Sequence, residues 1–309
     1  MAPPQGNNSG STRKSGLRRR SLFAGAAALG AVGAVGATAG CSRVATADTG
    51  DGGHLLEQLR AKGSVRLGLA GEQPYSYIGS DGEMTGSSPA IAKRIFKELG
   101  VDKVEPFPIE FGSLITGLNS LQFDVVAAGM YINPERCDQV IFADPEYQML
   151  DAFIVRKGNP KNLHSYKDIA KTGAKMATGV GYAEIDYAKE AGVKDIGTLP
   201  DQLAGLLAVK QGRIDVFVGT AVTVFNAVKQ AGPGSGVEAT KEVQPYVDGK
   251  PVIDVGGFAF RSPETTLRDA FNRELHKLKR SGELLEIMRP FGFTKDQMTT
   301  IRAEEKCKP

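Results

Sequence analysis

The sequence predicts an α/β protein with two lobes, each built on a parallel sheet that is covered by helices. Strand and helix patterns alternate along the chain after residue 54, and this alternation is typical of parallel sheets. One unit also occurs twice, at 113–129 and again at 203–220. Each copy consists of a helix, then an Asp, then a β-rich run that has a Gly near the end of the run. The length of 309 residues suits about two domains.

The first lobe begins with a buried strand predicted at 65–70, where aliphatic residues dominate. Ser88 is expected to cap the helix that follows, with Pro89 at its first helical position, because these residue types favour those places. Gly100 is expected to end the helix. Its apolar face consists of Ile91, Ile95 and Leu99.

A short helix capped by Ser113 is expected next, after a strand candidate at 109–110. This helix leads directly into a buried strand at 123–129. A strand that follows a helix so closely is typical of an α/β unit, so both elements belong to the first lobe.

The second lobe repeats this pattern. A helix that ends at Gly212 leads into a strand at 214–220, and another strand is expected to end near Gly181. The C-terminal part adds a strand at 257–260 and an amphipathic helix over 262–282.

The net charge of +3 comes from the first forty residues. They contain five basic residues and no acid, and the rest of the chain has 33 basic and 35 acidic residues, a net charge of −2 (33 − 35). A nucleic-acid-binding protein is expected to have a basic body. The slightly acidic body therefore argues against nucleic acid as a partner.

Residues 1–40 have the pattern of a secretory signal peptide. Basic residues at 18–20 precede an uncharged run of nineteen residues, Leu22–Gly40. The run is mostly Ala and Gly, which are too weakly apolar for a permanent transmembrane helix. The sequence Arg19-Arg20-Ser21-Leu22-Phe23 resembles the twin-arginine export signal, so we expect the protein to be exported.

The signal ends at Thr38-Ala39-Gly40-Cys41, which resembles a bacterial lipobox. Acylation of Cys41 would anchor the protein by lipid to the outer face of the cell membrane. The alternative is ordinary cleavage at a small-residue site, with Cys41 unmodified. Residues 41–54 are polar and are expected to form a flexible tether.

Two cysteines remain, Cys137 and Cys307. In an oxidising compartment they are candidates for a disulfide, and the alternative is two unpaired buried thiols. No Cys-x-x-Cys or His/Cys spacing indicates a metal site, so neither a metal nor a cofactor is expected. The three histidines are expected at the surface: His54, His164 and His276.

Polar and aromatic residues follow the predicted strands, where ligands of parallel sheets bind. They are Glu72, Tyr75, Phe111, Tyr131 and Arg136. Aromatic faces attract delocalised cations, and Arg holds a carboxylate through two hydrogen bonds. A site with both suits a zwitterion. The alternative is that the rings pack under loops and that Glu135 and Arg136 form an exposed ion pair of little energetic value.

Several motifs resemble one protein family. They are Glu110-Phe111-Gly112-Ser113-Leu114-Ile115 with Gly117-Leu118, Phe123-Asp124, Ala127-Ala128-Gly129-Met130-Tyr131-Ile132, Pro134-Glu135-Arg136-Cys137, Gly158-Asn159-Pro160-Lys161-Asn162-Leu163, Tyr187-Ala188-Lys189 and Thr220-Ala221-Val222-Thr223. Through them, residues 55–309 resemble the type II solute-binding proteins of ABC importers, and in particular the ectoine/hydroxyectoine-binding branch.

The resemblance implies a type II periplasmic-binding-protein fold with a two-strand hinge and a ligand cleft between the lobes. Lobe 1 would comprise 55–148 and 257–309, and lobe 2 would comprise 149–256. In this branch Tyr75, Phe111 and Tyr131 would form an aromatic cage. Glu72 would accept the ring N–H groups of the ligand, and Arg136 would bind its carboxylate.

The second lobe of the family usually offers a Gly-Thr pair at a helix N-terminus, where backbone N–H groups suit an anion. Here that place is occupied by Gly181-Tyr182-Ala183. The backbone N–H groups are expected to remain available, and Tyr182 is expected to narrow the cleft. Thr220 and Gly129, at the ends of two predicted strands, are further candidate contacts.

The resemblance also implies a function. The protein would be a monomeric substrate-binding lipoprotein, not an enzyme, that closes around a compatible solute and delivers it to a permease and an ATPase. One alternative is a polar or basic amino acid as the ligand. Another is a cyclohexadienyl-dehydratase-like enzyme with Glu184 or Glu72 as general acid, although no Gly-x-Ser-x-Gly motif is present.

Overall fold

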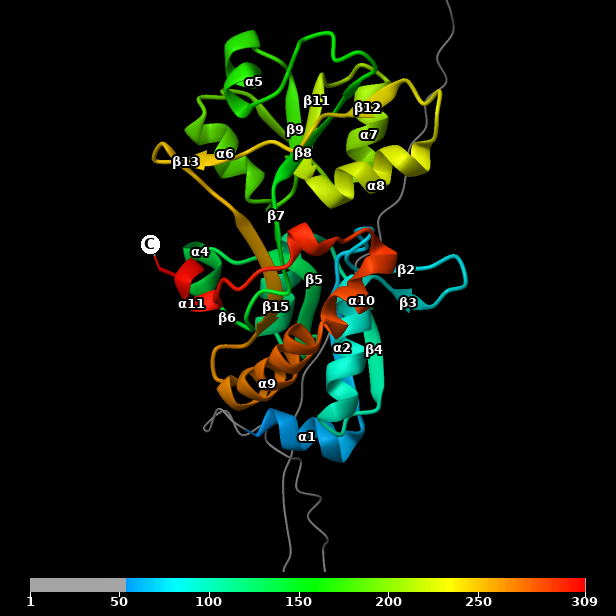
Figure 1. Ribbon diagram of the computed structural model, residues 1–309, viewed down its shortest axis with the longest axis vertical. Helices are drawn as coiled ribbons and strands as arrows, with labels where there is room; N and C mark the ends of the chain where they lie inside the picture. The colour runs from blue at the N-terminus through cyan, green and yellow to red at the C-terminus, as the bar shows by residue number, and fades with distance from the viewer. Residues whose placement is uncertain (1–53, 309) are drawn as a thin grey trace, which may run out of the picture. The chain divides into compact units, whose positions relative to one another are not determined.

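The computed structural model describes residues 54–308 of the chain. The predicted signal peptide, the predicted lipidation site Cys41 and the predicted tether up to residue 53 lie outside this range. Within it, none of the helices combines the length and the apolar character needed to span a bilayer. The described chain forms two main sheets, each with its own helices (Figure 1). We call these two bodies lobe 1 and lobe 2.

Lobe 1 is built on a six-stranded sheet in the order β4-β1-β5-β15-β6, with β7 paired to β15. Its strands are β1 (Ser64–Leu69), β4 (Lys103–Pro108), β5 (Val125–Tyr131), β6 (Ile141–Phe142), β7 (Tyr147–Met149) and β15 (Asp254–Phe260). Its helices are α1 (Leu55–Lys62), α2 (Ser87–Glu98), α3 (Leu114–Asn119), α4 (Pro134–Cys137), α9 (Thr265–Ser281), α10 (Glu283–Met288) and α11 (Ala303–Lys306). A hairpin of β2 (Tyr77–Ile78) and β3 (Met84–Thr85) precedes α2, and short 3₁₀ turns lie at Phe111–Ser113, Arg289–Phe291 and Lys295–Gln297.

Lobe 2 is built on a five-stranded sheet in the order β10-β9-β11-β8-β12. Its strands are β8 (Asp151–Arg156), β9 (Met176–Gly179), β10 (Ile196–Leu199), β11 (Val216–Thr220) and β12 (Val237–Ala239). Its helices are α5 (Tyr166–Thr172), α6 (Glu184–Glu190), α7 (Gln202–Lys210) and α8 (Ala221–Ala231). A small hairpin of β13 (Tyr246–Val247) and β14 (Lys250–Pro251) precedes the return to lobe 1.

The prediction of two parallel sheets is wrong for the strands through which the chain enters each lobe. In lobe 1, β1 is parallel to β4 and β5, but β15 is antiparallel to β5. In lobe 2, β9 is parallel to β10 and β11, but β8 is antiparallel to β11. Parallel neighbours need a crossover connection. The incoming strands β8 and β15 arrive directly from the other lobe, so they run the opposite way.

Two segments connect the lobes and lie side by side (Figure 1). One passes from β7 into β8, and the other returns into β15. Asp254 pairs with Met149, and an isolated bridge joins Asp151 to Val243. The lobe 1 sheet resumes at Asp254 rather than at the expected residue 257, because two glycines, poor strand formers, hide the start of β15.

The Asp of the repeated unit accepts a hydrogen bond from a residue in or beside the neighbouring strand in both lobes. Asp124, just before β5, accepts a hydrogen bond from the backbone N–H of Arg66 on β1, at 2.9 Å. Asp215, just before β11, accepts one from the backbone N–H of Lys175 beside β9, at 2.8 Å. Each carboxylate therefore ties the start of one parallel strand to its neighbour, which explains why both copies carry an Asp there.

The helix α2 begins differently from the prediction. Its N-cap is Gly86, and Ser88 lies inside the first turn, where its hydroxyl donates to Glu146 at 3.0 Å. Gly86 has φ +118°, and a Cβ there would lie 2.3 Å from the carbonyl oxygen of Tyr75. Only glycine fits under this backbone, so the helix starts beside the loop that carries Tyr75.

A disulfide joins Cys137, the last residue of α4, to Cys307, directly after α11. The two residues are 170 positions apart in the sequence, and their Cα atoms are 5.5 Å apart. The expectation of unpaired thiols therefore does not describe this structure. The bond fastens the C-terminal segment to the helix that follows β5.

Candidate functional site

The candidate site lies at the carboxyl edge of the lobe 1 sheet. Because β1 runs parallel to β4 and β5, the residues that follow these strands meet at one edge. The strand ends differ slightly from the prediction: β4 stops at Pro108, before the expected 109–110, and β5 continues past Gly129 to Tyr131.

One small cavity of about 20 Å³ is surrounded by all the predicted ligand residues except Gly181. Its predicted members are Glu72, Tyr75, Phe111, Gly129, Tyr131, Arg136, Tyr182 and Thr220, and the sequence analysis missed Ala183 and Thr223. Residues 182, 183, 220 and 223 belong to lobe 2 and the others to lobe 1. The cavity therefore lies between the lobes, as expected for a ligand cleft.

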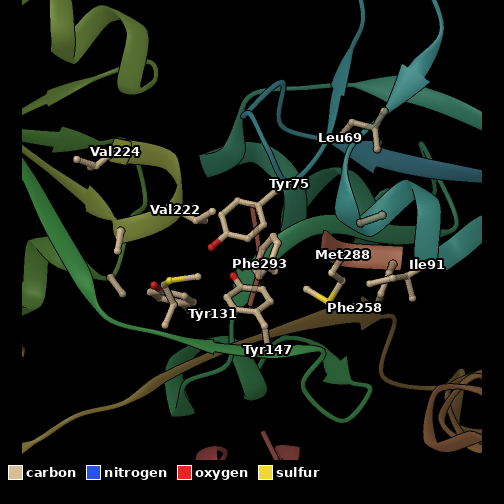
Figure 2. Close-up of a cluster of buried hydrophobic side chains, with 14 of the residues drawn as sticks. Leu69, Tyr75, Ile91, Tyr131, Tyr147, Val222, Val224, Phe258, Met288 and Phe293 are labelled. Carbon is tan, nitrogen blue, oxygen red and sulfur yellow. The ribbon is translucent and has the colours of Figure 1, made fainter. Parts of the chain in front are cut away.

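Tyr75 and Tyr131 belong to an aromatic layer that also contains Tyr147 and Phe293, two residues the sequence analysis missed (Figure 2). The rings of Tyr75 and Tyr147 are stacked with their centroids 5.2 Å apart. The Tyr147 hydroxyl donates to the carbonyl oxygen of Gly129 at 2.7 Å. A Cβ on Gly129 would lie 2.4 Å from the Tyr75 ring, so this glycine lets the ring pack against β5.

Arg136 is positioned by α4, whose N-cap Asn133 accepts a hydrogen bond from the Arg136 backbone N–H. Its guanidinium donates to the carbonyl oxygens of Tyr131 at 2.6 Å and of Gly181 at 2.9 Å. Its Cζ lies 5.3 Å from the centroid of the Phe111 ring. Arg136 is only 8% exposed, and this burial lowers its pKa. The alternative of an exposed ion pair with Glu135 is therefore wrong.

Glu72 follows β1 and is 4% exposed. Its carboxylate accepts a hydrogen bond from the hydroxyl of Tyr182 in lobe 2. Burial is the main cause that raises the pKa of Glu72 well above its usual value, and the nearby Arg136 acts in the opposite direction. A buried carboxylate of this kind favours a partner that donates hydrogen bonds.

The lobe 2 side of the site departs from the expected anion-binding backbone. The Tyr182 backbone N–H donates to the Gly179 carbonyl at 3.2 Å, and Gly181 contributes its carbonyl oxygen rather than an N–H group to Arg136. The Tyr182 ring meets Phe111 edge-on, with centroids 5.2 Å apart. Thr220, at the end of β11, accepts a 3.3 Å hydrogen bond from the Tyr75 hydroxyl.

Three buried carboxylates lie beside the crossing strands. Tyr166 donates to Asp151 at 2.5 Å, and Tyr187 donates to Asp254 at 2.5 Å. The third is Glu184, which is 1% exposed. Burial raises the pKa of Glu184 to about 8 and that of Asp254 to about 6, and it raises the pKa of Asp151 well above its usual range.

Sequence reasoning considered Glu184 only as a general acid and missed Asp151 and Asp254. Within residues 54–308, no cluster of His, Cys, Asp and Glu has the arrangement of a metal site.

A larger cavity of about 560 Å³ lies elsewhere in lobe 1, between α9, α10 and residues 295–302. It contains none of the predicted ligand residues. Its wall includes His276, which was expected at the surface but is half-buried and lies 2.7 Å from Asp144.

Known proteins match this chain over most of its length. Residues 65–294 match the model of the bacterial extracellular solute-binding proteins, family 3. The probable amino-acid ABC transporter periplasmic-binding protein y4tE of Sinorhizobium fredii is 34% identical over 255 residues, which cover 81% of this chain and 84% of that protein.

Two solved structures give the same picture. The crystal structure of EhuB in complex with hydroxyectoine aligns with a TM-score of 0.76 and 37% identity, over 82% of this chain and 98% of that one. The ancestral amino acid-binding protein AncCDT-1, described as a precursor of cyclohexadienyl dehydratase, aligns with a TM-score of 0.67 and 28% identity, over 76% of this chain and 98% of that one.

Proposed function

Because this chain belongs to the bacterial extracellular solute-binding proteins, family 3, and is a substrate-binding protein of an ABC importer for amino acids or related ligands, we propose that its ligand is ectoine or hydroxyectoine. The family confirms the predicted type II periplasmic-binding fold. Its members bind small ligands and deliver them to a permease and an ATPase, so the chain belongs to a transport family rather than to an enzyme family.

The observation that carries the proposal is the meeting of Glu72, Phe111 and Arg136 around one interlobe cavity. Arg136 offers a planar donor group to a carboxylate, and Glu72 accepts hydrogen bonds from a protonated ring. The aromatic face of Phe111 attracts a delocalised cation. Ectoine combines these features, because it is a small cyclic zwitterion with a carboxylate and a delocalised ring cation.

The binding mechanism follows from the distribution of these groups. Glu72, Phe111 and Arg136 belong to lobe 1, so the ligand binds lobe 1 first. Lobe 2 then closes over it by bending at the two crossing segments beside Asp151 and Asp254. Closure is driven by the ligand's preference for the closed state. The closed form then docks on the permease as a monomer.

An amino acid is the second candidate, because a relative with 34% identity is described as a probable amino-acid ABC transporter periplasmic-binding protein. Its carboxylate would use Arg136 in the same way. The aromatic groups distinguish the candidates, since a primary ammonium favours hydrogen bonds to carboxylates, whereas a delocalised ring cation gains more from Phe111.

A dehydratase-like activity is the weaker alternative. The general acid would be Glu184 or Glu72, but Glu184 does not line the cavity and is almost completely buried. Glu72 is therefore the one of these two acids that could reach a bound substrate. Turnover of a cyclohexadienyl acid by the purified protein, abolished by Glu72→Gln, would support this activity.

The test is a thermal-shift screen followed by calorimetry on residues 54–309, after denaturant has removed any co-purified ligand. Ectoine, hydroxyectoine and the twenty common amino acids are compared. A ligand at 100 times its Kd should add ~2.7 kcal/mol of stability. Stabilisation by ectoine or hydroxyectoine alone is expected. Stabilisation by an amino acid, but not by ectoine or hydroxyectoine, would contradict the proposal.

We further infer that residues 1–40 direct export and that Cys41 carries the lipid anchor. The lipobox resemblance at 38–41 supports this inference. Mass spectrometry of the mature protein from cells should give an acylated N-terminal Cys41. A mature chain with an unmodified Cys41 would contradict the lipid anchor and favour ordinary cleavage.

A further inference from the structure

Gly181 and Tyr182 of lobe 2 form hydrogen bonds with the polar groups of lobe 1 that the proposed ligand would use. The Tyr182 hydroxyl donates to Glu72, and the Gly181 carbonyl accepts from Arg136 at 2.9 Å. One segment of the chain thus supplies a hydrogen-bond donor for the carboxylate and an acceptor for the guanidinium. This is the same polar pairing that a zwitterion offers.

The ring of Tyr182 also lies against the aromatic part of the site. The rings of Tyr182 and Phe111 form an edge-to-face pair, with the centroids 5.2 Å apart and the planes at 75°. With Tyr182 in this position, the cavity that Glu72, Phe111 and Arg136 line together has a volume of about 20 Å³, which is room for about one water molecule. A second cavity of about 330 Å³ also reaches Phe111 and Arg136, but Glu72 does not line it. A solute of about ten heavy atoms therefore cannot contact Glu72 and Arg136 together in this cavity while Tyr182 keeps this position.

The backbone around Tyr182 is shaped to hold the ring there. A Cβ on Gly179 would lie 2.3 Å from the Tyr182 ring, so any other residue at 179 would displace it. The Tyr182 N–H closes a tight turn on the Gly179 carbonyl. Gly181, at φ +77°, brings its backbone close to Gly112, and a Cβ on Gly181 would lie 3.1 Å from the Gly112 Cα.

The contact with Tyr182 also offsets an electrostatic cost. Glu72 is buried when the lobes are closed, and a buried carboxylate without a donor is strongly disfavoured. Tyr182 supplies that donor from the other lobe. A further interlobe hydrogen bond, from Tyr75 to Thr220, reinforces the same arrangement. The chain therefore contains its own stabilising contacts for the closed arrangement.

We propose that Gly181-Tyr182 is a built-in mimic of the ligand, which closes the lobes on the site and which the solute must displace. This inference rests on the proposed function in assuming that the solute binds Glu72 and Arg136. Only the fraction of protein that is open can bind the solute. The apparent affinity is therefore the intrinsic affinity multiplied by this open fraction. Competition with the internal mimic also selects solutes that carry both a carboxylate and a hydrogen-bond donor, because weaker partners do not displace Tyr182.

The test measures lobe closure without any ligand. Residues 54–309 are unfolded in denaturant without reductant, dialysed, refolded and studied by small-angle X-ray scattering. We compare the wild type with Tyr182→Thr and with the control Tyr246→Thr, which changes an exposed tyrosine on β13 (47% exposed) that does not line the cavity. Circular dichroism and thermal unfolding establish that each variant is folded.

The wild type and Tyr246→Thr are expected to scatter as the closed structure does, and Tyr182→Thr is expected to have a larger radius of gyration. Equal radii for the wild type and Tyr182→Thr would overturn the inference, whether both are closed or both are open. If Tyr182→Thr fails to fold, the variant Tyr182→Phe is used instead, and the rate of backbone hydrogen exchange in the 72–76 loop is compared with that of the wild type. Faster exchange than in the wild type supports the mimic, and unchanged exchange overturns it.

The proposed function is tested separately by adding ectoine to Tyr182→Thr. Closure on addition of ectoine supports both proposals. An open variant that fails to close with ectoine or hydroxyectoine would contradict the proposed ligand, while the ligand-free comparison would still support the mimic.

Discussion

The hydroxyl of Tyr187, on α6 of lobe 2, donates a 2.5 Å hydrogen bond to Asp254, the first residue of β15 in lobe 1. This bond joins the lobes beside the hinge, and the charge of Asp254 adds to the burial that raises the pKa of two more carboxyl groups, Asp151 and Glu184. Arg136 is the cation that faces Glu184 and Asp254, and Lys306 also acts on Asp254. Closure therefore brings together more acidic than basic groups, which makes protons part of its energetics.

The folded protein is expected to lose stability as the pH rises from about 5.5 to 8.5. Burial raises the pKa of Glu184 to about 8 and that of Asp254 to about 6, above the ~4 of unfolded chains. A raised carboxyl pKa means that the folded state binds more protons than the unfolded state in this window. Its stabilising contribution is complete below pH ~4 and is lost as the pH rises through the folded pKa.

Thermal unfolding at a series of pH values measures this effect. Glu184→Gln removes one of the titrating groups and is expected to flatten the decline between pH 6 and 8.5. The control Glu190→Gln changes an exposed residue at the end of the same helix and should leave the wild-type slope. A slope in Glu184→Gln equal to that of the wild type would rule out Glu184 as the source.

The sequence predicted that the lobe 1 residues proposed for the site lie together, because parallel strands bring their ends to one edge whatever the loop details. Glu72, Phe111 and Arg136 each follow a different predicted strand, and all three line the cavity. The position of Tyr182 was also predicted from the resemblance, but its direction was not. The Tyr182 ring can point this way only because Gly179 has no side chain, and no pattern of residue types reveals this packing.

The carboxylate network could not be predicted in the same way. Asp254 and Tyr187 are 67 residues apart, and they meet only because the chain returns to lobe 1 beside the segment through which it left. Tyr147 and Phe293 were missed for a similar reason, since their contact joins β7 to a segment near the C-terminus. The cap of α2 was misplaced because Ser88 finds a buried partner, Glu146, instead of a free backbone N–H.

Arg136→Ala is expected to weaken ectoine binding by about 10- to 150-fold in calorimetry. Removing a hydrogen bond to a charged group costs ~1.5–3 kcal/mol, and each ~1.4 kcal/mol is tenfold in affinity. Arg213→Ala, which changes an exposed arginine after α7, should leave the affinity unchanged. Unaltered affinity in Arg136→Ala would exclude its contact with the ligand carboxylate.

Phe111→Leu is expected to weaken ectoine binding by about 2- to 30-fold, the loss of ~0.5–2 kcal/mol of cation–π attraction. A neutral ligand of similar shape should lose less, because Leu keeps most of the apolar contact. Phe107→Leu is the control, since this ring packs against Phe123 and does not line the cavity. Equal losses for the charged and neutral ligands would mean that Phe111 acts by packing alone.

Removal of the disulfide in Cys137→Ser/Cys307→Ser is expected to destabilise the protein by about 2–5 kcal/mol in denaturant titrations. The bond closes a loop of 170 residues, and a cross-link over so long a loop removes much entropy from the unfolded chain. Because the bond holds the segment after α11 against α4, and Arg136 belongs to α4, the loss should extend to ligand affinity. The single substitution Ser281→Ala, at the exposed end of α9, serves as a control for a surface change. A double variant with the stability of the wild type would show that packing around residues 301–307 fastens this segment without the covalent bond.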